Sequence, residues 1–250
     1  MNEFYLTLPS NSSMDVYPTN TKTDFKTKLP NRIELDGKWE VGLVEIQYPH
    51  SWYNLAEGEE VVKLWYFPIN TPVQELTLTI PPGYYNTIED LLNRIEDEIQ
   101  LVTNATRKPV LLRYDEITRK VTIDCFDIQV EFKEGLRRIL GFEIIRIKDG
   151  KTLATQTVDM DPLHSIYVYC DLLESRIVGD KMTQLLRVVP VEGKSGDMVT
   201  RTYENVHYVS LQLKSFEDVE INIRDDSGNY VPFERGTLNV TLHFRRQRVL

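Results

Sequence analysis

The sequence predicts a mostly β protein that folds as a sandwich or jelly roll with a helical insertion. Three features indicate this class. Many short segments alternate apolar and polar residues, turn-forming residues separate these segments, and one long segment has helical periodicity instead. Short strands with one helical insertion fit a sandwich or jelly roll better than a fold in which strands and helices alternate.

Alternation with a period of two is clearest towards the C-terminus. Val219, Ile221 and Ile223 are apolar with polar residues between them, and every second residue of segment 238–244 is apolar. This pattern directs one face of a strand to a core and the other to water. The same pattern predicts strands over 76–80, 166–170 and 209–213, and longer apolar runs predict central strands over 39–48 and 61–67.

Turn chemistry separates these segments. Residues 225–229 (DDSGN) and 35–38 (LDGK) contain residues that tolerate a positive φ, so each predicts a tight turn between strands. Residues 81–83 (PPG) end the preceding strand, because proline cannot donate a hydrogen bond to a sheet.

Helical periodicity begins after Asn86 and Thr87, either of which can cap a helix whose apolar face runs from Ile88 to Ile99. A shorter helix is predicted over 134–140, ended by glycine at 141. Between the two helices, segments 111–113 and 121–124 predict a hairpin.

The composition and charge of the chain disfavour several classes of function. The chain has 250 residues, 29 basic and 38 acidic, and a net charge of −9. A nucleic-acid-coating protein usually has a basic excess, so we expect no specific nucleic-acid binding. The N-terminus lacks a signal-peptide pattern and no apolar run is long enough to span a membrane, so we expect a protein that is not secreted. Cys125 and Cys170 are far apart in sequence, which predicts reduced, buried thiols in an intracellular protein.

No catalytic pattern is visible. Residues 193–195 (GKS) resemble the end of a phosphate-binding loop, but Val188 stands where that loop needs glycine. No two histidines lie within four residues of each other, so no local metal site is predicted. His243 lies between core positions on its strand, so we expect it to face solvent or a partner. We therefore expect no enzyme activity, no cofactor and no metal.

Two clusters are candidates for contact with a partner. Tyr48, His50, Trp52 and Tyr53 form the densest aromatic cluster, which predicts an interface or, equally, a corner where a strand leaves the core. Arg245, Arg246 and Arg248 form a basic C-terminal cluster, which is either a contact surface or a solvated tail, and composition alone favours the tail.

Several segments resemble the minor capsid proteins of Polinton/Maverick elements and adintovirus-like viruses. The similarity covers most of the chain and consists of strand and turn residues. Segments 4–13 (FYLTLPSNSS) and 39–49 (WEVGLVEIQYP) resemble the start of these proteins. Segments that resemble later parts are 80–85 (IPPGYY), 167–171 (YVYCD), 185–190 (LLRVVP), 232–236 (PFERG) and 242–246 (LHFRR).

The resemblance implies a single jelly-roll capsid domain over 1–250, with a helix and hairpin insertion around 84–145. Such proteins are pentons, so it also implies a homopentamer at the fivefold vertices of an icosahedral particle, built through head-to-tail interfaces. The implied neighbour is a double-jelly-roll major capsid protein, and the implied location is the virion, after assembly inside the host cell. The alternatives are a β-sandwich module that binds a receptor or carbohydrate, and a cupin-type enzyme, which would need converging histidine and carboxylate ligands.

Overall fold

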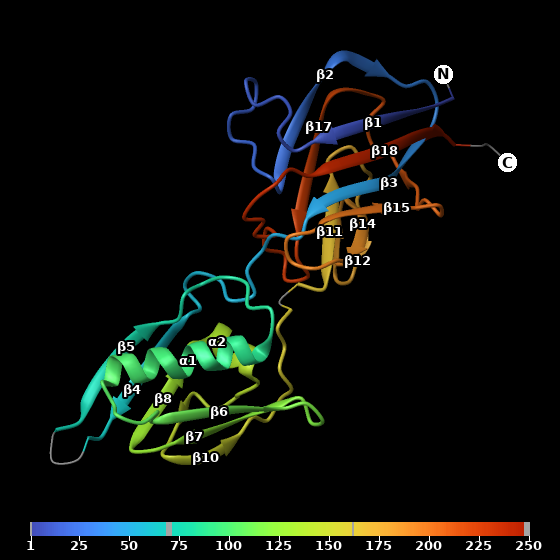
Figure 1. The fold of residues 1–250 in the computed structure, drawn as a ribbon. Helices are drawn as coiled ribbons and strands as arrows, with labels where there is room; N and C mark the ends of the chain where they lie inside the picture. Colours follow the sequence, from blue (N-terminus) through green and yellow to red (C-terminus); the bar gives the residue numbers. More distant parts are fainter. Residues whose placement is uncertain (1, 69–71, 162, 248–250) are drawn as a thin grey trace. The chain divides into compact units, whose positions relative to one another are not determined.

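The computed structural model describes residues 2–68, 72–161 and 163–247, and it is built mainly from antiparallel strands. The chain divides into two compact units (Figure 1). Unit 1 combines Met1–Trp52 with Leu163–Leu250, and unit 2 is Tyr53–Pro162. The predicted all-β class is confirmed.

Unit 1 consists of two sheets. The first has the order β1-β18-β3-β15, with the short strand β16 also pairing with β3, and the second has the order β14-β11-β17-β2. Strands of the first sheet are β1 (Glu3–Pro9), β3 (Trp39–Pro49), β15 (Met198–Thr202), β16 (Val209–Ser210) and β18 (Asn239–Arg246). Strands of the second are β2 (Asp24–Glu34), β11 (Ser165–Cys170), β14 (Leu185–Pro190) and β17 (Ser215–Arg224), and a separate hairpin pairs β12 (Arg176–Val178) with β13 (Lys181–Thr183).

This strand order is that of a jelly roll. When the eight strands of the two sheets other than β16 are counted along the chain, the first sheet reads 1-8-3-6 and the second 5-4-7-2. Each sheet thus mixes strands from both ends of unit 1, as two nested Greek keys require. The predicted jelly-roll sandwich is confirmed, and unit 2 lies in the chain between its third and fourth strands.

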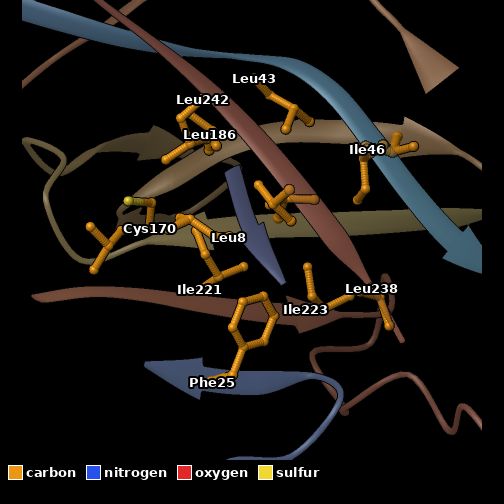
Figure 2. Close-up of a cluster of buried hydrophobic side chains, with 14 of the residues drawn as sticks. Leu8, Phe25, Leu43, Ile46, Cys170, Leu186, Ile221, Ile223, Leu238 and Leu242 are labelled. Atoms are coloured by element: carbon orange, nitrogen blue, oxygen red, sulfur yellow. The ribbon is translucent and has the colours of Figure 1, made fainter. Parts of the chain in front are cut away.

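The apolar side chains of the alternating segments fill the space between the two sheets. Leu43 and Leu242 from the first sheet, and Ile221 and Ile223 from the second, are fully buried. Figure 2 shows these side chains with Phe25 in one apolar cluster. The predicted strand over 209–213 is shorter than expected, because only Val209–Ser210 pairs with β3.

Unit 2 has its own apolar core, two sheets and two helices in its described part. The sheet orders are β5-β4-β8-β9 and β10-β7-β6. The strands are β4 (Val61–Tyr66), β5 (Gln74–Thr79), β6 (Val110–Asp115), β7 (Lys120–Cys125), β8 (Ile128–Phe132), β9 (Arg146–Ile147) and β10 (Gly150–Leu153). The segment 84–145 lies wholly within unit 2, which also contains β4, β5, β9 and β10.

Helix α1 (Ile88–Thr103) begins where its capping residues predict. Thr87 and Asp90 form a reciprocal capping box, and the apolar face that includes Ile95 is buried in the core of unit 2. Helix α2 (Glu134–Leu140) ends at Gly141, whose φ is +78°. A side chain at this glycine would lie 2.4 Å from the Gln156 carbonyl oxygen, so the position requires glycine. Neither helix combines the length and apolar character needed to cross a membrane, among the residues described.

Because unit 2 has a separate core, we expect Tyr53–Pro162 to fold when it is expressed alone. The Ile95→Ala substitution should then lower its free energy of unfolding by about 2–5 kcal/mol, the usual cost of such a truncation in a core. Urea unfolding followed by circular dichroism would measure both effects. A fragment without a cooperative transition would contradict an independent unit 2.

Candidate interaction surfaces

The predicted aromatic cluster lies where β3 ends and the chain leaves unit 1. Tyr48, His50 and Trp52 are buried, with exposed fractions of 0%, 5% and 2%, whereas Tyr53 is 39% exposed. The His50 ring stacks on Trp52 with centroids 4.1 Å apart, and Phe233 meets Trp52 edge-on at 5.8 Å. Burial raises the pKa of Tyr48, which keeps its hydroxyl protonated.

Hydrogen bonds from the main chain and from Ser51 hold this corner against two loops. The His50 amide donates to the Asp197 carbonyl (2.8 Å), and the Gly196 amide donates to the His50 carbonyl (2.7 Å). The Ser51 hydroxyl donates to the Arg235 carbonyl (2.9 Å). The placement therefore agrees with the corner interpretation, and partner contact by this cluster stays a prediction, with Tyr53 its one exposed member.

Two of the C-terminal arginines, Arg245 and Arg246, have partners inside unit 1. The Arg245 Nε lies 2.6 Å from Glu40 Oε1, and its guanidinium lies 3.4 Å from the centroid of the Tyr208 ring. Arg246 pairs with Asp36 at 3.5 Å, and Arg248 lies outside the described residues. The two described arginines thus sit in balanced charge pairs, and their role in partner contact stays a prediction.

An outer cluster formed by Glu3, Tyr5, Tyr208, His243 and Arg245 covers the solvent side of β1 and β18. Tyr5 lies directly opposite His243, and the two rings stack 4.4 Å apart. His243 Nδ1 lies 2.7 Å from the Tyr208 hydroxyl, and Nε2 lies 3.4 Å from Glu3. His243 points away from the core as expected, but these neighbours leave it only 7% exposed.

Gly42 makes this cluster possible. It lies opposite His243 on β3, and a side chain there would come within 2.3 Å of Val206 and 2.9 Å of the His207 carbonyl oxygen. Glycine therefore allows the loop before β16 to cross the outer face of the sheet and bring Tyr208 onto His243 and Arg245.

The hairpin of β12 and β13 carries an exposed apolar pair that the sequence analysis missed. Ile177 and Met182 are paired across the two strands, with exposed fractions of 76% and 63%. Adjacent exposed apolar side chains are typical of interaction sites. The available signal was the turn at Gly179 between two short segments, 176–178 (RIV) and 181–183 (KMT), each with an apolar residue at its centre.

Unit 2 contains a cleft of about 750 Å³, a volume in the range of small-molecule sites. Its lining includes Tyr66, Phe67, Arg107, Phe126 and Asp127. The sequence alone could not predict it, because the lining comes from three segments that are far apart in the chain, 66–68, 105–111 and 126–127.

The described residues offer few groups for catalysis. Cys125 and Cys170 are free and buried, and burial raises the pKa of the Cys125 thiol to about 12, so thiolate formation is disfavoured. No cluster of three or more histidine, cysteine or acidic residues in the described ranges could hold a metal. The loop at 193–195 is followed by strand β15, not by the helix that a phosphate-binding loop needs.

Comparison with solved structures gives the mavirus penton protein as a match, with a TM-score of 0.53 over 97% of this chain and 99% of that chain. This chain has the penton fold. Sequence identity is 10%, so the likeness is one of fold. The Sputnik virophage structure matches at 11% identity over 98% of both chains, with a TM-score of 0.48. No protein-family model and no curated protein sequence gives a significant match to the chain.

Arg245 should contribute more to the stability of this penton fold than Arg246 does. We expect Arg245→Ala to lower the free energy of unfolding by about 1 kcal/mol, because it removes both a charge pair and a cation–π contact. Arg246→Ala is the matched control, because the one ion pair of Arg246 within the described ranges is with a highly exposed carboxylate. Its effect should stay within about 0.5 kcal/mol. Urea unfolding measures both, and equal losses would contradict the assignment.

Proposed function

We propose that this chain is a penton, a minor capsid protein that forms homopentamers at the fivefold vertices of an icosahedral DNA virus or virus-like transposon particle. The observation that carries the proposal is the match to the mavirus penton protein over 97% of this chain and 99% of that chain. This coverage extends over both the jelly roll of unit 1 and the inserted unit 2. The match disfavours a receptor- or carbohydrate-binding module as the main role of the chain.

A closed ring needs two different surfaces on each subunit, because head-to-tail contacts join unlike patches. Unit 1 offers several distinct surfaces, including the outer cluster on β1 and β18 and the apolar hairpin of β12 and β13. Tyr53 and the C-terminal arginines remain candidates for contact with a double-jelly-roll major capsid neighbour.

The proposed role is geometric and involves no reaction. Its working parts are a stable sandwich and surfaces that recognise neighbouring subunits. The two thiols are buried, and His243 is enclosed by Tyr5 and Tyr208, so these groups serve packing. The proposal places the protein at the vertices of the virion, after assembly inside the host cell.

Light scattering of the purified chain, followed by negative-stain imaging, tests the proposal. We expect a particle of five times the 29.2 kDa mass of the chain, with a fivefold ring in projection. If the ring closes only on the particle, the chain should occupy vertices when it is co-expressed with the major capsid protein. A trimer, or a chain that stays monomeric and absent from vertices, would contradict the proposal.

We expect the apolar hairpin to contact a second copy of the chain. A two-stranded ribbon is only marginally stable alone, and burial against a partner would remove the exposed apolar surface of Ile177 and Met182 from water. The double variant Ile177→Ser/Met182→Ser should raise the dissociation constant of the ring at least about tenfold, equivalent to about 1.4 kcal/mol.

The matched control is Val16→Ser, which alters another exposed apolar residue of unit 1 (56% exposed). It should leave the ring intact. Concentration-dependent light scattering compares the variants, and an unchanged ring in the double variant would exclude the hairpin from the interface.

A further inference from the structure

The cleft in unit 2 lies where the chain passes from one sheet to the other, between β7 and β8. The Phe126 amide donates to the Pro109 carbonyl and the Phe67 amide donates to the Asp127 carbonyl, each at 2.8 Å. These bonds join the three described segments that line the cleft, 66–68, 105–111 and 126–127. The walls are therefore fixed by the fold before any ligand arrives.

Two phenyl rings line the cleft without being buried by the protein. Phe67 and Phe126 are 37% and 47% exposed, and Tyr66, which packs partly on the core of unit 2, also lines the cleft. Exposed aromatic surface forgoes the stabilisation of about 25 cal/mol per Å² that burial would give. Aromatic rings gathered in a concave site supply flat apolar surfaces on which a ligand can stack.

The two cationic side chains at the cleft, Lys108 and Arg107, differ in their ion pairs. Lys108 is engaged by the protein itself, at 2.7 Å from Asp97 and 3.0 Å from Glu96. Its neighbour Arg107 is exposed, and no ion pair involves it among the residues that the structure describes. Arg107 is thus available for an anion, and a guanidinium binds a carboxylate through two parallel hydrogen bonds.

We propose that this cleft binds a carboxylated sugar residue. A pyranose ring has an apolar C–H face that stacks on phenyl rings, and its hydroxyls bind polar groups such as those of Thr106 and Asp127, which also line the cleft. Its carboxylate would pair with Arg107. A wholly apolar ligand would leave Arg107 and Asp127 unpaired on desolvation, and the net charge of −9 disfavours a nucleic acid.

The site goes beyond the proposed capsid role and does not depend on it. All of the lining residues belong to unit 2 of one chain, so the cleft does not require a second copy of the chain. If the chain does not form pentamers, the sugar site is not contradicted. If the sugar does not bind, the proposed capsid role is not contradicted.

Saturation-transfer NMR on the full chain tests the inference, because it observes the ligand and works at any particle size. The probe is the methyl glycoside of N-acetylneuraminic acid, with lactose as the neutral sugar and sodium acetate as the carboxylate without a sugar. We expect saturable binding of the acidic sugar, and binding at least tenfold weaker for lactose and acetate.

Three variants at two residues separate the roles of charge and stacking. Arg107→Gln should weaken binding of the acidic sugar at least tenfold and remove the preference over lactose, whereas Arg107→Lys should retain part of it. Phe126→Ala should weaken binding of the sugar at least tenfold. Both residues are exposed, so thermal melting should show wild-type folding for all three variants.

The matched controls lie in the turn at the other end of the β6–β7 hairpin. Arg119→Gln removes an exposed arginine and Ile117→Ala an exposed apolar side chain (94% exposed), and both should bind like the wild type. The inference is overturned if the acidic sugar does not bind saturably, or if acetate or lactose binds with the same affinity as the acidic sugar. It is also overturned if Arg107→Gln has no effect on binding of the acidic sugar.

Discussion

The pairing of the first strand with the last is the contact on which unit 1 depends. Strand β1 runs antiparallel to β18 from Glu3 opposite Arg245 to Pro9 opposite Asn239, and β18 also pairs with β3. Insertion of β18 between two N-terminal strands completes the first sheet and covers the apolar faces of the second. The same pairing aligns Tyr5 with His243, so the outer cluster is a direct product of the strand register.

Local features were predictable because they depend on neighbouring residues. The period of two located β17 and β18, and Thr87 and Gly141 marked one end of each helix through their capping chemistry. The order of strands in each sheet depends on contacts between distant residues, and the jelly-roll expectation therefore rested on resemblance.

The candidate surfaces show where residue chemistry is ambiguous. Tyrosine, tryptophan and histidine each suit a buried corner as well as an interface, so the type of residue could not show that Tyr48 and Trp52 are buried. The sequence could not show that Arg245 and Arg246 are paired, because their partners, Glu40 and Asp36, are about 200 residues away in the sequence. The cleft in unit 2 could not be predicted either, because its lining residues are also far apart in the sequence.

The position of β18 near the C-terminus delays completion of the first sheet during synthesis on the ribosome. Strand β3 ends at Pro49 and its partner β18 begins at Asn239, with the whole of unit 2 encoded between them. At a synthesis rate of about 5–20 residues per second, the N-terminal strands wait roughly 10–40 s for this partner. Unit 2 can meanwhile fold, whereas the apolar faces of β1 and β3 stay uncovered until β18 is synthesised.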